Sequence, residues 1–170
     1  MLSANCNFTP FGIFLTKGDI YSTMDLQSFN ATTQSGSFEL QAIQEVPLTA
    51  LTNVSNHAVK VEITSTGQWC LINFETPDPK LAKYKRLTDG DGYEPDKNDE
   101  SYKFKYPHLK PAALVSEIKD AEGNVKSSFG GKQQSLKLEP GETLSFIMND
   151  DPHYFNNNAG QLTISYSVSA

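Results

Sequence analysis

Segments that alternate apolar and polar residues with a period of two recur from residue 37 to the C-terminus. Successive side chains of a β-strand point to opposite faces, so this alternation is typical of strands with one buried face. The segments are SFELQAI (37–43), AVKVEIT (58–64), QSLKLE (134–139), TLSFIMN (143–149) and QLTISYSVS (161–169). Turn sequences separate them at TSTG (64–67), AEGN (121–124), FGG (129–131) and EPGE (139–142). The pattern predicts an all-β protein, an antiparallel β-sandwich.

Length and charge narrow the class of protein. The 170 residues suit one domain with a sizeable core, and no apolar run reaches the length of a membrane span. A net charge of −6 argues against nucleic acid or an anionic membrane surface as the partner, because both require a basic face. The N-terminus lacks the basic stretch and apolar run of a secretory signal. We leave open a cytoplasmic location and an exported or cell-surface one.

Three features depart from the strand rhythm. Residues 1–36 are rich in Ser, Thr, Asn and Gly, and we interpret them as an N-terminal extension or extra strands before a domain at 37–170. DPKLAKYKRL (78–87) is the best helix candidate, although its periodicity is weak. Cys6 and Cys70 form no metal-binding spacing, and whether they pair stays open.

The loop NDDPHYFNNN (149–158) interrupts the last two strand patterns with carboxylates and amides. Hard cations such as Ca²⁺ bind oxygen atoms of carboxylates, amide side chains and backbone carbonyls, and this loop offers all three. A polar turn is the alternative interpretation, since Asn and Asp favour turns.

The same segment, FIMNDDPHYFNNNAGQLTISYSV (146–168), resembles the closing segment of the LecA-like (PA-IL-type) bacterial galactophilic lectins. Their pattern is Asn-Asp-x-Pro, four residues, Asn-Asn-x-Gly and a final alternating strand. KPAALVSEIKDAEGNV (110–125), VKVEITSTGQW (59–69) and DGDGYEPD (89–96) are similar to earlier pieces of that family. The resemblance covers residues 38–170. It implies a β-sandwich of the galactose-binding-domain-like, jelly-roll type and a calcium-dependent galactose-binding homo-oligomer.

The resemblance also implies a ligand set for Ca²⁺. It assigns the carboxylate of Asp150, the side-chain oxygens of Asn157 and Asn158, and the backbone carbonyl of Tyr154. A further backbone carbonyl falls on Leu71, with Ile72 as the alternative, because the spacings from Gly67 and from Trp69 differ by one residue.

Sugar contacts are implied less directly. In the family a His-Pro-Asp-Gln segment contacts the sugar, and here it aligns with Glu94, Pro95, Asp96 and Lys97, or alternatively with YPHLK (106–110). The ligand-binding residues expected on this basis are Asp150, Asn157, Glu94, Asp96, Lys97 and His153. Because the family's His and Gln are absent, the preference for galactose is open.

Other chemistries find little support. DGDGYEPDKNDE (89–100) places acidic residues at positions one, three and twelve of an EF-hand-like loop, but Glu94 stands where Gly is required. A second ion there stays an alternative to a solvated acidic loop. No nucleophile elbow is present, and Glu94 with Asp96 is a weak candidate for a glycosidase pair. We therefore expect no enzyme.

Two functions remain. The first is a soluble calcium-dependent lectin, with galactose-type glycans as partners. The second is a calcium-stabilised structural or interaction β-sandwich that binds no sugar. Both require the loop at 149–158, so the sequence does not separate them.

Overall fold

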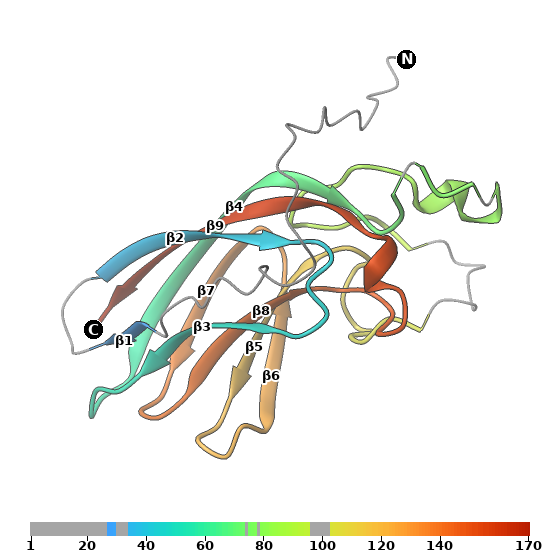
Figure 1. The fold of residues 1–170 in the computed structure, drawn as a ribbon. Coiled ribbons are helices and arrows are strands. Elements are labelled where there is room, and N and C mark those ends of the chain that lie inside the picture. The colour runs from blue at the N-terminus through green and yellow to red at the C-terminus, as the bar shows by residue number, and fades with distance from the viewer. Residues whose placement is uncertain (1–26, 30–33, 74, 78, 96–102) are drawn as a thin grey trace, which may run out of the picture.

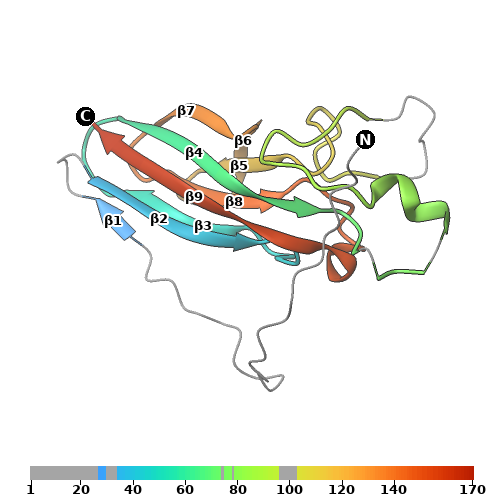
Figure 2. The same cartoon turned by 90° about the horizontal axis from the view of Figure 1, so that it is seen from above.

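The computed structural model describes residues 27–29, 34–73, 75–77, 79–95 and 103–170. Within these residues the chain is all-β, with two stacked sheets and two short 3₁₀ helices, as Figures 1 and 2 show. The predicted β-sandwich is therefore confirmed. No helix in the described ranges is long and apolar enough to cross a membrane.

The first sheet has five strands. Their order is β1 (Gln27–Phe29), β3 (Leu48–Asn53), β8 (Thr143–Met148), β5 (Leu114–Lys119) and β6 (Val125–Gly130). The pairing of β1 with β3 is parallel, and the other pairings are antiparallel. β5 and β8 at the centre are almost entirely buried, which explains why their sequences alternate less clearly than the edge strands.

The second sheet has four antiparallel strands. Their order is β2 (Gln34–Gln41), β9 (Ala159–Ser169), β4 (Val59–Cys70) and β7 (Gln133–Leu138). β2, β4, β7 and β9 bury alternate residues, as the sequence predicts. Their apolar faces meet the first sheet, and the rings of Phe38 on β2 and Phe146 on β8 lie 5.4 Å apart across the core. Apolar burial between the layers is the main stabilising contribution to such a sandwich.

Two local predictions need correction. TSTG (64–67) is not a turn, because β4 continues through it to Cys70 and pairs with β9 along its whole length. Gly67 adopts φ +104° inside the strand. A Cβ at this position would lie 2.7 Å from the backbone oxygen of Gln161, so the close approach of β9 also requires glycine here. The helix candidate forms only a 3₁₀ helix, η1 (Pro79–Tyr84).

The domain boundary drawn at residue 36 falls inside β2, and β1 also belongs to the sandwich. Residues 1–26 and 30–33 lie outside the described residues, and Cys6 is among them. Cys70 is buried at the end of β4.

Two long connections gather at one end of the sandwich. One joins β4 to β5 and contains η1, and the other joins β8 to β9 and contains η2 (Phe155–Asn157). Both appear at the right of Figure 1, in green to yellow and in red. The polar loop of the sequence thus lies beside residues that are up to 116 positions away in the chain, as the hydrogen bonds below show.

Candidate functional site

Asn149 fixes the start of the polar loop. It is fully buried, and its side-chain N–H groups donate to the backbone oxygens of Tyr106 at 3.0 Å and Lys110 at 3.0 Å. Its side-chain oxygen accepts from the N–H of Tyr106 at 3.1 Å, and its backbone pairs with Ala112 and Ala113. Asn149 therefore clamps the 105–113 segment to the end of β8. The sequence analysis assigned no role to Asn149.

Asp150 follows directly and has an exposed fraction of 0%. Its Oδ1 accepts from the N–H of Asp151 at 2.7 Å, and its Oδ2 accepts from Nδ2 of Asn158 at 2.8 Å. Within the described part of the chain no cationic side chain forms an ion pair with it. Burial raises the pKa of the Asp150 carboxyl to about 7, although these two hydrogen bonds lower it. A buried carboxyl without a cation is a costly arrangement for a native protein.

Two amide oxygens of the same loop are also left without partners. The side-chain oxygens of Asn157 and Asn158 are buried and accept no hydrogen bond from the residues that the structure describes. Nδ2 of Asn158 donates to the backbone oxygen of Ala42 at 3.0 Å and to Asp150, so the Asn158 amide is held in place by its nitrogen. Buried polar atoms without partners are rare in native proteins, and a bound ion is one explanation for them.

The backbone carbonyls expected to complete the set come from two places. The N–H of Asn73 donates to the backbone oxygen of Asn157 at 2.6 Å, so the chain that follows β4 runs beside the loop. This contact places the segment containing Leu71 and Ile72 against the loop but does not decide between their carbonyls. The carbonyl of Tyr154 accepts from the N–H of Asn157 at 3.1 Å and has a second lone pair.

The donor chemistry fits a hard cation. No three His, Cys, Asp or Glu side chains come together as a metal site among the described residues. A metal in the loop would therefore be held by one carboxylate and several neutral oxygens, which suits Ca²⁺ better than a softer metal.

Asp151 has a different role from Asp150. Its carboxylate accepts from the N–H of Lys103 at 3.3 Å and from the N–H of His153 at 3.1 Å, so both oxygens serve the fold of neighbouring backbone. His153 and Tyr154 are exposed at the rim of the loop. His153 is thus an exposed residue of the loop, held by its backbone N–H to Asp151.

The two rival stretches for the sugar contacts begin at Glu94 and at Tyr106. Glu94 is exposed, and its Oε1 lies 2.5 Å from Nζ of Lys110. The described part of the first stretch therefore meets the end of the second. Asp96 and Lys97 lie outside the described residues.

The acidic stretch that starts at Asp89 already contains a cation from the protein. Nζ of Lys132 lies 2.9 Å from Oδ2 of Asp89 and 3.0 Å from Oδ2 of Asp91. The backbone N–H of Lys132 donates to the Asp91 carboxylate at 2.9 Å, and this hydrogen bond is the main reason that the pKa of Asp91 is lowered. The ammonium group occupies the position between these carboxylates that a second ion would take. Glu100 is not among the described residues.

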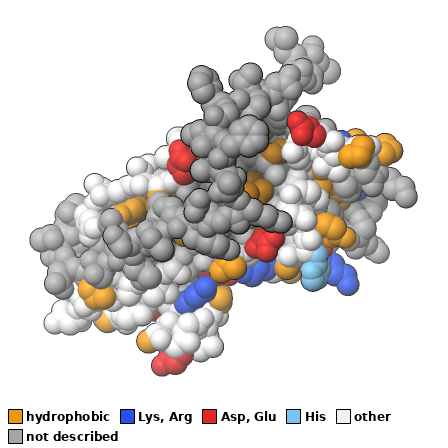
Figure 3. All heavy atoms as spheres, in the orientation of Figure 1, with side chains coloured by type: hydrophobic (Ala, Val, Ile, Leu, Met, Phe, Trp, Pro, Cys, Tyr) orange, Lys and Arg blue, Asp and Glu red, His pale blue; other side chains and the backbone are white. Residues whose placement is uncertain are grey.

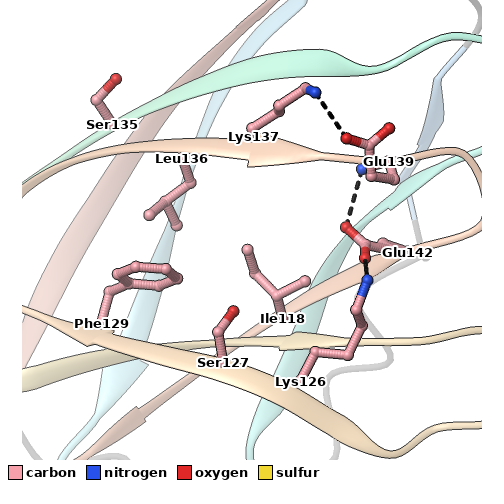
Figure 4. Close-up of a pocket in the computed structure, with 9 residues that line it drawn as sticks. All are labelled: Ile118, Lys126, Ser127, Phe129, Ser135, Leu136, Lys137, Glu139 and Glu142. Atoms are coloured by element: carbon pink, nitrogen blue, oxygen red, sulfur yellow. Dashed lines mark hydrogen bonds and ion pairs between the residues drawn. The ribbon is translucent and has the colours of Figure 1, made fainter.

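Another hollow lies between β6 and β7, toward the opposite end of the sandwich. Figure 4 shows Phe129, Leu136 and Ile118 facing one another there, with the ions at the margin paired to each other. Lys126 pairs with Glu142, and Lys137 lies 2.7 Å from Glu139. Its charges are thus satisfied within the protein. On the face drawn in Figure 3, acidic and basic side chains are interspersed, without a continuous basic area among the coloured side chains.

Comparisons with known proteins give a limited result. No family model matches the chain, and no curated protein matches it. Among solved structures, the chain is similar to the N-terminal domain of EclA, described as a PllA-like lectin. The identity is 14% and the TM-score 0.48, over 76% of this chain and 92% of that one. This degree of similarity does not assign the chain to a family, and the LecA-like resemblance stays an interpretation of the sequence motifs.

Proposed function

We propose that this chain is a calcium-dependent carbohydrate-binding protein. In this proposal Ca²⁺ is held by the Asp150 carboxylate, the side-chain oxygens of Asn157 and Asn158, and the backbone carbonyls of Tyr154 and of Leu71 or Ile72. The observation that carries the proposal is the buried Asp150 carboxyl, which pairs with no cation among the described residues and is hydrogen-bonded to Asn158. In the same described residues, the side-chain oxygens of Asn157 and Asn158 in this loop have no hydrogen-bond donor. One divalent cation would satisfy all three groups.

The sugar part of the proposal follows from coordination chemistry and from the sequence resemblance. Ca²⁺ takes six to eight oxygen ligands, and the five expected from the protein leave positions for two neighbouring sugar hydroxyls. The exposed rim at His153 and Tyr154 is the side from which a ligand reaches the loop. The LecA-like motif favours galactose-type sugars. The missing His and Gln of the family's sugar-contacting segment leave the exact sugar open.

One observation favours the alternative, a structural role for the ion. Asn158 contacts Ala42 after β2, and Asn157 contacts Asn73 after β4, so the loop joins three chain segments of the sandwich. An ion bound there would stabilise the fold even if no sugar ever bound.

The two functions are separated by a glycan array probed in 1 mM CaCl₂ and again in excess chelator. Retention on galactose-containing glycans that disappears with chelator supports the lectin. The Asp150→Asn variant should bind no glycan in either condition, whereas Asp151→Asn should keep the binding. If the native protein binds calcium but no glycan on the array, the structural role is favoured instead.

We also propose a homo-oligomer, because a shallow site of weak affinity gains useful strength from several copies. Light scattering of the calcium-loaded protein at micromolar concentration should give at least the mass of a dimer. A mass of about 19 kDa, that of the single chain, would contradict this.

A further inference from the structure

A second group of side chains lies on the connection between β4 and β5, which also contains the 105–113 segment that Asn149 holds. Lys83, Tyr84, Arg86, Tyr93 and Glu94 line a hollow of about 270 Å³. Arg86 follows η1, and the guanidinium carbon of Arg86 lies 3.8 Å from the centre of the Tyr93 ring. Stacking on an aromatic face fixes the plane of a guanidinium group and directs its N–H groups outward.

Arg86 has no carboxylate partner within the part of the chain that the structure describes. Its guanidinium group donates to the backbone oxygen of Glu94 at 3.2 Å, while the Glu94 carboxylate pairs with Lys110. Among the described residues, most of the five N–H donors of Arg86 are therefore available. Arg86 is exposed, so it brings an accessible positive charge to this hollow in a protein of net charge −6.

Tyr93 connects this hollow to the candidate calcium loop. The N–H of Tyr93 donates to the backbone oxygen of Pro111 at 3.1 Å, and the next residue, Ala112, pairs with Asn149, the residue before Asp150. Among the described residues, the buried Tyr93 hydroxyl has no hydrogen-bond partner. Burial raises the pKa of this hydroxyl, and the positive charge of Arg86 on its ring lowers it.

We infer that Arg86, held on Tyr93, forms an anion-binding subsite near the candidate calcium loop, and that the sugar it selects is a hexuronic acid. The hydroxyls of such a sugar would face the loop while its carboxylate accepts two parallel hydrogen bonds from the guanidinium group. This inference rests on the proposed carbohydrate function and names the substrate class for that site. It also gives a physical reason for Glu94 being paired with Lys110, since a free carboxylate there would repel the acidic sugar.

The test uses two probes that differ only at carbon 6, methyl galactoside and methyl galacturonoside. Calorimetric titrations in 1 mM CaCl₂ at low salt should show about five- to tenfold tighter binding of the acidic probe by the native protein. Arg86→Gln should reduce this preference to less than about twofold and leave the affinity for methyl galactoside unchanged. Lys137→Gln is the matched control, because it removes the same charge at the far end of the sandwich. It should keep the preference.

Each outcome has a distinct meaning. If the acidic probe is preferred equally by the native protein and by Arg86→Gln, the ion itself selects the carboxylate, and the Arg86 subsite is wrong. If the neutral probe binds as well as the acidic one, the subsite is wrong while the lectin function stands. If neither probe binds in calcium, both proposals fail. Melting curves of the three proteins show whether Arg86→Gln has changed the fold, which is not expected for an exposed side chain.

Discussion

Asn149 and Asp150, at the start of the loop, have different roles. The side-chain hydrogen bonds of Asn149 all go to the 105–113 segment. The buried carboxyl of Asp150, by contrast, pairs with no cationic side chain among the described residues. A neutral amide suits the clamp because it offers donors and an acceptor together, whereas an ionised carboxylate only accepts. The negative charge is kept for the position where it is buried beside partnerless oxygens.

This division predicts different consequences for two matched substitutions. Asp150→Asn keeps the size of the side chain and removes its charge, so calcium affinity should fall at least about 100-fold, because the carboxylates of such a site tune its affinity. Asp151→Asn should change the affinity less than about threefold, since the Asp151 carboxylate is occupied by backbone N–H groups. Calorimetric titration with CaCl₂ at pH 8 measures both, above the pKa of about 7 that burial gives to Asp150. Equal losses in the two variants would contradict the ligand assignment.

The resemblance could suggest candidate side-chain ligands because Asp150, Asn157 and Asn158 lie within nine residues of one loop motif. The clamp made by Asn149 could not, because its partners are backbone groups about 40 positions away, and no side-chain pattern marks them. The stacking of Arg86 on Tyr93 escaped notice for the same reason, since a pair seven residues apart in a loop has no characteristic spacing.

Strands β4 and β9 position the loop through an unusually close approach. Gly160 lies opposite Trp69 with φ +90°, and a Cβ on it would lie 2.5 Å from the backbone oxygen of Gln68. Trp69 is fully buried, and its ring N–H donates to the backbone oxygen of Ala112 at 2.8 Å. The start of β9, the end of β4 and the 105–113 segment are thereby held together around the loop.

Gly160→Ala should therefore destabilise the protein by about 2–4 kcal/mol, because the new methyl group clashes with backbone and strains a left-handed residue. Gly123→Ala is the control. Gly123 also has a positive φ, +87°, but a Cβ there meets nothing within 4 Å. Its cost should be about 1 kcal/mol, which comes from conformation alone. Urea unfolding of the two variants compares them, and similar losses would mean that the close approach contributes nothing.

Central strand β5 carries a buried charge that should make stability depend on pH. Glu117 has an exposed fraction of 1%, and its carboxylate contacts Lys105 at 3.0 Å, Lys119 at 3.1 Å and the hydroxyl of Tyr106. Burial alone would raise the pKa of Glu117, but the hydrogen bonds from Tyr106 and Lys105 outweigh it and leave the pKa below its ordinary value. A lowered carboxyl pKa contributes stability above the unfolded pKa, and this contribution is lost as the pH falls through the folded one.

Glu117→Gln should accordingly cost about 2 kcal/mol at pH 7 and less as the pH falls below about 4.5. Glu122→Gln is the control, since Glu122 is an exposed residue of the hairpin between β5 and β6. It should unfold like the native protein at every pH. Urea unfolding from pH 7 to pH 3 measures the effect. A cost for Glu117→Gln that does not shrink in acid would show that the carboxylate charge is not the stabilising feature.

At the scale of the whole molecule, the sequence predicted the sandwich but not its pairings. Alternation along β2, β4, β7 and β9 reports which face is buried, and this is enough to predict two layers. It does not report which strands are neighbours, so the parallel pairing of β1 with β3 and the central place of β8 come only from the structure. The error at 64–67 has a similar origin, because a glycine required by a close neighbouring strand looks like a turn glycine.

Because the loop joins segments that follow β2, β4 and β8, calcium should stabilise the entire sandwich and not the loop alone. For a dissociation constant of about 10 μM, 1 mM CaCl₂ contributes about 2.7 kcal/mol. In a domain of this size that raises the melting temperature by about 5–10 °C over the protein in chelator. MgCl₂ at the same concentration should give a much smaller rise, since Mg²⁺ requires a tight octahedral set of ligands. Asp150→Asn should melt at one temperature with or without calcium. If the native protein melts at the same temperature in calcium and in chelator, calcium does not bind in this loop. The proposal of a calcium-dependent lectin would then fail as well.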